Sequence, residues 1–373
     1  MPRTRSASVL AAVALAACTA TAAAHPKPAP APRPTADVLA APSPVLGTDH
    51  RRHLVYEIVL HNPTATRATV ERAVVLDRRR NTTIESYEGQ GLTQLLGPFG
   101  RPVVAEPTVE PGQDARLYFD VKLPEAARVP ARLAHRITLS LPPRRVVLTD
   151  ADARVDRRPP VRLSPPLRAG GLLGVAAHTP VAVDGRLSHA QRFAIDYAQL
   201  NEAGDDVLSG DPSRNESYEV YGEEILAAGD GTVVATRDDM AENAPGSEPP
   251  FTSWDTVAGN RVVEALGHGR YALYAHMQPG SVRPHVGDRV RRGDVIGLVG
   301  NTGNSDAPHL HFHVMDGPGG ASALDANGLP YVFDRFELIG NIPDLSAPVL
   351  VPADPPGERN DEYPLTGDIA SFP

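Results

Sequence analysis

Short runs of alternating apolar and polar residues, separated by turn signals, recur along most of this 373-residue chain. Successive side chains of a strand point to opposite faces, so this alternation predicts strands with one buried face. The chain holds 38 Pro, and only 5% of its residues are aromatic, which favours short strands and many turns over helix bundles. The predicted fold class is therefore all-β.

The first 24 residues have the features of a secretory signal peptide. Arg3 and Arg5 precede an apolar run, residues 9–17, that is too short to span a membrane as a helix. The single cysteine, Cys18, follows Leu-Ala-Ala and resembles the end of a bacterial lipobox, where a lipid would anchor the protein to a membrane. We expect an exported lipoprotein that faces the periplasm or cell wall, in the outer membrane if the host has one. Cleavage after Ala24 is the alternative, and it would release a soluble protein.

Composition divides the rest of the chain into further segments. Residues 25–45 are a Pro-rich tether. Residues 46–165 contain runs such as "HLVYEIVLHN" and "ATVERAVVLD", the pattern of an immunoglobulin-like β-sandwich without a cluster of catalytic residue types. The stretch "DRRPPVRLSPPLRAGG" is interpreted as a linker. Residues 171–340 form a second β domain, and residues 341–373 are Pro-rich without periodicity, which indicates a wrapping or disordered extension.

Turn signals in the second domain predict closely spaced strands. "YGEEILAAGDGTVVAT" contains a Gly-Asp-Gly turn between two strand-like runs, and "NRVVEALGHGRYALYAHM" contains a turn at residues 267–269. Both are typical of β-hairpins.

The charge of the two halves differs in sign. Residues 37–165 hold 19 Lys and Arg against 15 Asp and Glu, whereas residues 166–373 hold 13 against 30. An acidic second half argues against a nucleic-acid partner, because such a surface would repel the phosphate backbone.

The stretch "HLHFHV" places three of the 13 histidines on alternate positions. In a strand, His309, His311 and His313 would share one face, while the apolar residues between them would point into a core. A half-exposed strand is the ordinary meaning of alternation, but solvated faces usually carry Thr, Lys or Glu. Three imidazoles therefore favour metal or proton chemistry.

Three ordered blocks, "LYAHM", "VGDRVRRGDVIGLVGNTG" and "APHLHF", resemble the lysostaphin/LytM-type zinc endopeptidases, which cut peptide bonds in peptidoglycan. The resemblance covers roughly residues 175–338. It implies a β-sheet peptidase domain of the duplicated-hybrid-motif kind, a zinc ion, and a peptidoglycan peptide as substrate.

The resemblance also implies roles for individual residues. Asp196 and His311 would bind zinc, while His309 and His276 would be catalytic and would stabilise or move protons. By strand alternation, Ala272, Tyr274 and His276 share a face, which would aim His276 at the same pocket. His313 falls outside the ligand set, and either supports the site or is solvated.

The third zinc ligand is where the chain departs from the family pattern H-x-G-x-D. Asp196 matches the Asp, but Arg192 occupies the position of the His. His178 and His189 are the possible replacements. We prefer His178, because an odd offset of seven residues on a continuous strand would turn His189 to the opposite face, whereas the turn "VDGRL" could fold His178 back. If neither binds, the zinc is lost.

Two functions compete on this basis. One is a zinc-dependent endopeptidase that hydrolyses stem peptides or cross-links of peptidoglycan. The alternative is a metal-free, degenerate domain that binds or regulates another cell-wall hydrolase. Four of the five expected positions are present, which favours the enzyme.

Overall fold

Strands make up nearly all the regular structure of the chain, as the alternating sequence predicts. The computed structural model describes residues 32–96, 106–176, 181–183, 186–246, 249, 252–320, 323–345 and 348–373, of which residues 33–373 form one unit. In these ranges the helical elements are α1 (Gln90–Leu95) and the single-turn 3-10 helices η1 (Ala190–Phe193) and η2 (Asn215–Ser217). None of the helices described there is long and apolar enough to cross a membrane.

Two antiparallel sheets face each other in the N-terminal part of this unit. The first contains β1 (Thr35–Val38), β2 (Ser43–Leu46), β3 (Arg51–His61) and β7 (Asp114–Pro124). The second contains β4 (Ala68–Asp77), β5 (Thr82–Tyr87), β6 (Thr108–Val109), β8 (Arg132–Leu141), β9 (Arg144–Leu148) and β10 (Ala153–Arg154).

One apolar core joins the two sheets. Tyr56 of β3 stacks on Phe119 of β7 with their ring centroids 5.1 Å apart, and both pack in the same cluster as Val75 of β4 and Ile137 of β8. Two sheets with a shared core make a β-sandwich, and its immunoglobulin-like type stays a prediction.

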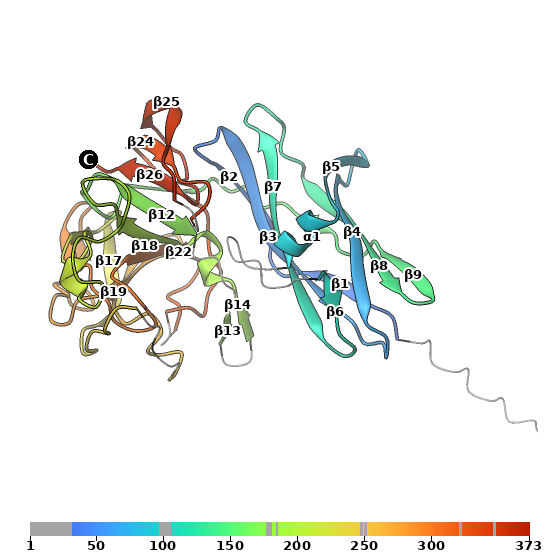
Figure 1. The fold of residues 1–373 in the computed structure, drawn as a ribbon, viewed down its shortest axis with the longest axis horizontal. Coiled ribbons are helices and arrows are strands. Elements are labelled where there is room, and N and C mark those ends of the chain that lie inside the picture. Colours follow the sequence, from blue (N-terminus) through green and yellow to red (C-terminus); the bar gives the residue numbers. More distant parts are fainter. Residues whose placement is uncertain are drawn as a thin grey trace, which may run out of the picture. The chain divides into compact units, whose positions relative to one another are not determined.

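A larger sheet, ten-stranded in the described ranges, occupies the second half of the chain (Figure 1). Its strands, in spatial order, are β20 (Arg289–Val290), β17 (Gly231–Arg237), β18 (Asn260–Gly267), β19 (Arg270–Met277), β22 (Leu310–Met315), β15 (Ile195–Gln199), β12 (Leu172–Ala176), β26 (Asp368–Ser371), β24 (Phe336–Asn341) and β25 (Val351–Arg359). Three two-stranded ribbons accompany it: β11 (Val161–Leu163) with β23 (Tyr331–Phe333), β13 (Val181–Val183) with β14 (Arg186–Ser188), and β16 (Glu224–Leu226) with β21 (Val295–Leu298).

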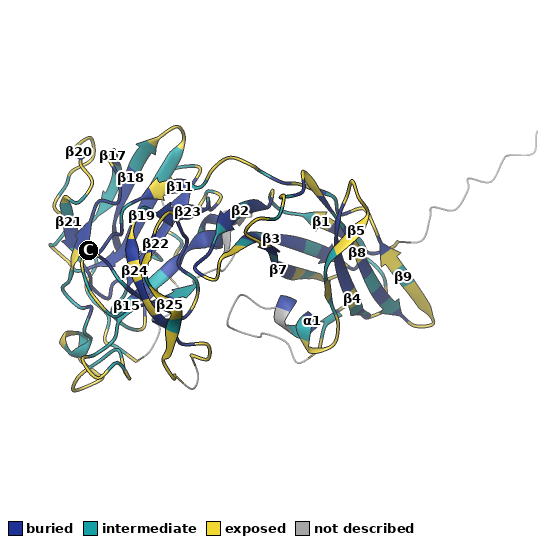
Figure 2. Ribbon diagram, turned by 90° about the horizontal axis from the view of Figure 1, so that it is seen from above, coloured by how far each residue is buried: buried dark blue, intermediate teal, exposed yellow. Residues whose placement is uncertain are grey.

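Strand β22 is buried on both faces, whereas β25 is mostly exposed (Figure 2). As its alternation predicts, Leu310, Phe312 and Val314 point into the main core of the second half. The opposite face of β22 lies over a smaller apolar cluster that contains Leu273 and Met315. The histidines of β22 lie on this second face, since Leu273 is the cross-strand partner of His313.

Two segments expected to be connectors contribute strands. The tether expected over residues 25–45 contains β1 and most of β2, and the expected linker contains β11. Among the described strands β2 forms a ladder with β3, and an edge strand tolerates a proline such as Pro44 because it needs fewer backbone donors. The Pro-rich composition of both segments led to a prediction of connectors, although each contains strands.

The segment after residue 340 is also part of the sheet, which differs from the expected wrapping or disordered extension. β25 is a Pro-rich strand at the outer edge, and β26 pairs with both β12 and β24. Ile369 and Phe372 are almost fully buried.

Of the two hairpins predicted in the second domain, one is present and the other is not. β18 and β19 form the expected hairpin around Gly267. β16 and β17 flank the Gly-Asp-Gly turn but do not pair with each other: β16 pairs with β21, and β17 pairs with β18 and β20. The turn thus links two sheets.

Candidate active site

The sheet register places Asp196 of β15 directly opposite His311 of β22. His311 Nδ1 lies 2.7 Å from Asp196 Oδ1. The His311 side chain is only 6% exposed, whereas that of Asp196 is 33% exposed. The carboxylate therefore reaches solvent while the imidazole is enclosed.

His309 lies immediately before β22 and points toward the same carboxylate. Its Nδ1–H donates to the carbonyl oxygen of Ala307 at 2.8 Å. Its Nε2 lies 3.6 Å from Asp196 Oδ1. Because the hydrogen of a neutral ring is then on Nδ1, Nε2 carries a lone pair at the site.

His276, near the end of β19, has a left-handed backbone with a φ of 63°. Its Nδ1–H donates to the carbonyl oxygen of Thr302 at 2.7 Å. Its ring centroid lies 4.6 Å from that of His309 and 5.8 Å from that of His311. The lone pair on Nε2 is again free to act at the site.

The way His276 reaches the site differs from the sequence expectation. Ala272 and Tyr274 pack into the main core, on the face opposite to His311. Regular alternation would have sent His276 into that core with them. The left-handed backbone at residue 276 breaks the alternation, and Met277 takes the core position instead.

The electrostatics of the site favour an ionised Asp196 and a neutral His276. Burial would raise the pKa of Asp196, but the imidazoles of His309 and His311 hold it well below its usual range. Burial lowers the pKa of His276, and the neighbouring imidazoles lower it further. Asp196 is therefore ionised at neutral pH, and His276 is neutral.

His313 is buried rather than solvated. It is 0% exposed, and its Nδ1 lies 2.9 Å from Nε2 of His311. Burial keeps the pKa of this ring well below the ordinary histidine value. His313 thus contacts the His311 ring on the side away from Asp196.

The two histidines considered for the third ligand are His178 and His189. His178 lies outside the described residues, so its assignment stays a prediction. Residues 190–193 form η1, so the chain does bend between His189 and Asp196, yet His189 is buried with its Nδ1 3.5 Å from Glu57 Oε2. Within the described ranges, no group of three His, Cys, Asp or Glu side chains is arranged to hold a metal ion.

Arg192, which stands where the family pattern has a histidine, is engaged with the sandwich. Its Nη2 donates to Glu57 Oε2 at 2.9 Å and its Nε to Glu57 Oε1 at 3.3 Å. The Glu57 side chain is fully buried in β3. Sequence reasoning missed this pair, because its members lie 135 residues apart.

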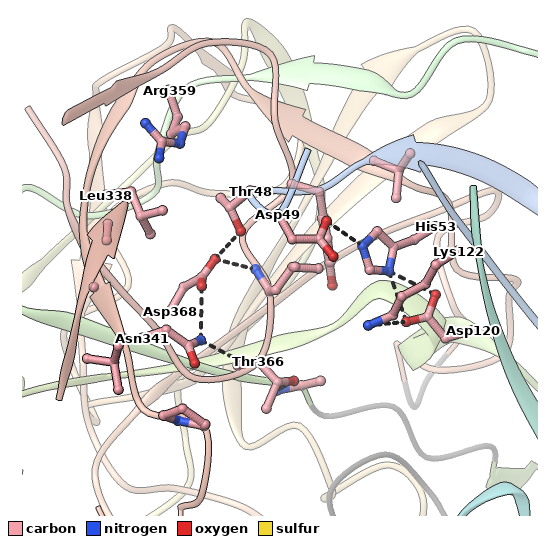
Figure 3. Close-up of a pocket in the computed structure, with 18 of the residues that line it drawn as sticks. Thr48, Asp49, His53, Asp120, Lys122, Leu338, Asn341, Arg359, Thr366 and Asp368 are labelled. Atoms are coloured by element: carbon pink, nitrogen blue, oxygen red, sulfur yellow. Dashed lines mark hydrogen bonds and ion pairs between the residues drawn. The ribbon is translucent and has the colours of Figure 1, made fainter. Parts of the chain in front are cut away.

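A separate cavity of about 560 Å³ lies between the sandwich sheet and the C-terminal strands (Figure 3). At one end His53 contacts two carboxylates, with Nδ1 2.9 Å from Asp120 and Nε2 3.0 Å from Asp49. Burial alone would lower the pKa of His53, but these two hydrogen bonds raise it to about 9. Beside Asp49, Thr48 donates to Asp368 Oδ2 at 2.5 Å. No sequence motif connects these residues.

Comparisons with known proteins bear on the histidine site. Residues 217–325 match the model of Peptidase family M23. The chain is 35% identical over 106 residues to the peptidoglycan DD-endopeptidase ShyA of Vibrio cholerae, a match that covers 28% of this chain and 20% of that protein. It is 52% identical over 42 residues to a glycyl-glycine endopeptidase of Staphylococcus capitis, covering 11% of each chain. The matched segments thus span a fifth or less of these relatives.

A solved structure, the catalytic domain of lysostaphin from Staphylococcus simulans, is similar at 21% identity and a TM-score of 0.24, covering 44% of this chain and 88% of that one. The matched family segment contains His276, His309 and His311, and Asp196 precedes it. Residues 217–325 of this chain are similar to Peptidase family M23.

Proposed function

We propose that this protein is a zinc-dependent endopeptidase that hydrolyses peptide bonds in the stem peptides or cross-links of peptidoglycan. The observation that carries the proposal is the convergence of Asp196 with three imidazoles, His276, His309 and His311, at one place on the sheet. Two matched relatives are named as endopeptidases, one of peptidoglycan and one of glycyl-glycine bonds, which supports this reaction class.

The donors of the site suit zinc, because an imidazole nitrogen of His311 and a carboxylate oxygen of Asp196 face a common point. We assign these two residues and His178 as the zinc ligands. A zinc ion bound there would supply Lewis acidity for the scissile carbonyl.

The chain's own catalytic groups are His276 and His309. Each ring is fixed by an Nδ1–H bond to a backbone carbonyl, so each presents an Nε2 lone pair. Such a nitrogen accepts a proton from the attacking water and then, as an imidazolium, donates it to the leaving amine. The protonated ring also stabilises negative charge on the carbonyl oxygen during attack.

Zinc content and hydrolysis test this proposal together. We expect the purified wild-type chain to hold about one zinc ion and to release peptide fragments from purified peptidoglycan. His311→Ala should abolish zinc binding, and His285→Ala, at a loop side chain that is 91% exposed, is the matched control. A wild-type chain that binds zinc but leaves peptidoglycan intact contradicts the proposed substrate.

The metal-free alternative has one observation in its favour: Arg192, at the position of the family's histidine ligand, is bound to Glu57. In that case the domain would act as a binding or regulatory partner of another cell-wall hydrolase. Absence of both zinc and hydrolysis in the wild-type chain would favour this alternative.

We also propose that the protein is exported and anchored through a lipid on Cys18, so that it faces the periplasm or cell wall. The support is the Leu-Ala-Ala-Cys sequence after a short apolar run. Cys18→Ser should move the protein from the membrane fraction to the soluble fraction. A wild-type N-terminus at His25 in a soluble fraction would refute the anchor.

A further inference from the structure

A single loop, residues 301–307, supplies the two backbone carbonyls that orient the rings of His276 and His309. The carbonyl oxygen of Thr302 accepts the Nδ1–H of His276 at 2.7 Å, and that of Ala307 accepts the Nδ1–H of His309 at 2.8 Å. His276 lies near the end of β19 and His309 immediately before β22. The placement of one ring relative to the other therefore depends on the shape of this loop.

The loop packs directly against the backbone that precedes β18. A Cβ on Gly303 would lie 2.3 Å from the backbone nitrogen of Gly259 and 2.6 Å from the carbonyl oxygen of Val257. A Cβ on Gly259 would in turn lie 2.4 Å from the carbonyl oxygen of Thr302. Glycine allows two backbones to approach this closely. The N–H of Asn260 also donates to Thr302 Oγ1 at 2.9 Å, so the start of the loop is held by neighbouring backbone.

The middle of the loop is bound by one side chain from another segment, that of Asn243. Its Nδ2 donates to the carbonyl oxygen of Gly303 at 2.8 Å and to that of Ser305 at 2.9 Å. A carbonyl can only accept, so the amide nitrogen must face both, with one hydrogen for each. The backbone N–H of Asn243 donates to the carbonyl of Asn301 at 2.8 Å. These bonds fix the loop between the two carbonyls that orient the rings.

Ser305 extends the network toward His309. Its side chain is buried, and its Oγ lies 2.6 Å from Asn301 Oδ1 and 2.9 Å from the carbonyl oxygen of Ala307. The Ala307 carbonyl is the one that accepts from His309. Buried polar networks whose members are hydrogen-bonded are rigid. A displacement of Ser305 would therefore be passed to the group that orients His309.

We propose that Asn243 is a positioning residue, which holds the loop over residues 301–307 so that the His276 and His309 rings are oriented together. The inference rests on the proposed endopeptidase function, because these two rings are the groups assigned to proton transfer. Both hydrogen bonds described for the Asn243 side chain go to the loop. Asn243 would thus act on the rings through the loop. A displacement of about 1 Å at a reacting group can cost about 100-fold in rate.

Two substitutions of Asn243 test this role. Asn243→Asp keeps the size of the side chain but places carboxylate oxygens against two carbonyl oxygens, whereas Asn243→Ala removes the amide without adding a charge. For a soluble cross-linked fragment of peptidoglycan, we expect kcat to fall about 10- to 100-fold in both variants. KM should stay unchanged, because the substitution removes alignment in the transition state and not substrate binding. Thermal unfolding verifies that each variant folds.

The matched control is Asn360, an exposed asparagine whose Nδ2 donates to Glu358 Oε1. Asn360→Asp and Asn360→Ala make the same chemical changes away from the loop. Both should keep the kcat and KM of the wild type.

Two NMR measurements on the purified chain need neither substrate nor hydrolysis. In the wild type, scalar couplings across hydrogen bonds should join Asn243 Nδ2 to the carbonyl carbons of Gly303 and Ser305. Magnetisation transfer between the C–H groups of the His276 and His309 rings should be strong in the wild type, where the ring centroids lie 4.6 Å apart. It should be weaker in folded Asn243→Ala.

The inference is overturned if the wild-type couplings are absent, or if a folded Asn243→Ala keeps the ring contact or the kcat of the wild type. A higher KM at unchanged kcat would also overturn it, because Asn243 would then act in substrate binding. A wild-type chain that hydrolyses no peptidoglycan refutes the proposed function instead. The NMR measurements then still decide whether Asn243 sets the placement of the two rings.

Discussion

His276 shows how a single backbone angle can place a side chain at the candidate site. A left-handed backbone costs an L-residue on the order of 1–3 kcal/mol, so the surrounding structure must hold it. His276 N–H donates to the carbonyl of Ala258, and Gly300 N–H donates to the carbonyl of His276. Together with the bond from the ring to Thr302, these contacts turn the side chain out of the main core and toward His309.

The first prediction concerns the two histidines that we propose to handle protons. His276→Ala and His309→Ala should each keep zinc but lower the rate of peptidoglycan hydrolysis by about 100-fold or more. Each removes a ring that accepts and donates the proton, without removing a proposed ligand. Zinc content and fragment release are measured in parallel, with His285→Ala as control. Near-normal turnover in either variant would contradict the assigned roles.

Glu264 supports a prediction about pH. It is fully buried, accepts a hydrogen bond from the Tyr274 hydroxyl at 2.6 Å, and burial raises its pKa from 4.5 to about 7. The folded state therefore binds a proton more tightly than the unfolded state. The free energy of unfolding should fall as pH rises from about 4.5 through about 7, because the unfolded carboxyl ionises first.

Glu264→Gln tests this, since it keeps the size of the side chain and removes the charge. Urea unfolding at pH 5 and pH 8 should show that the variant gains stability relative to wild type at the higher pH. Equal pH dependence in the two proteins would show that Glu264 does not titrate in this range.

At the level of strands, the sequence predicted where the strands lie better than which strands pair with each other. The run "ATVERAVVLD" corresponds to β4, and "HLHFHV" has its apolar residues in the core as expected. Alternation of apolar and polar residues predicts a strand with a buried face, and both of these strands have such a face. The partners of β16 and β17 depend on contacts between distant segments, and no local pattern reports these.

The same limit applies to the candidate site. Asp196, His276, His309 and His311 lie together, and the ordered motifs gave reason to expect this. The left-handed angle at His276 and the bond between Arg192 and Glu57 were not predictable, because each depends on structure formed elsewhere in the chain.

Phe372, just after β26, tests whether the C-terminal strands are structural. Its ring packs against Tyr197, Phe333 and Phe336, with centroids 5.3–6.1 Å apart. Phe372→Ala should lower the free energy of unfolding by about 3–5 kcal/mol, the usual cost of such a core truncation. Val349→Ala is the control, at a side chain that is 69% exposed. An unchanged unfolding curve for Phe372→Ala would support a tail that does not pack.

At the scale of the whole molecule, a buried ion pair joins the sandwich to the segment before Asp196. Glu57 and Arg192 have side chains that are 0% and 3% exposed, and His189 lies beside them. A charge buried here is tolerated only while the opposite charge is present. The sandwich and the peptidase sheet are therefore expected to unfold together.

Glu57→Gln should lower the free energy of unfolding by about 3–5 kcal/mol, because the Arg192 guanidinium stays buried without this carboxylate. Glu57→Leu and Arg192→Met are also made singly and together, and the double variant, which removes both charges, should recover much of the loss. Chemical unfolding measured for each variant gives the coupling between the two sites. Additive losses in the single and double variants would show that the pair does not couple the two parts.

The position of β26 between β12 and β24 also bears on the order in which an exported chain can become active. In a chain exported as proposed, translocation would deliver the N-terminal side first, so the sandwich, Asp196 and the histidines would all emerge before residues 368–371. Until then β12, the neighbour of the strand that carries Asp196, lacks its second partner. A hydrolase assembled in this way would complete its sheet only after nearly all of the described chain had left the cytoplasm, which separates its synthesis in time from its activity.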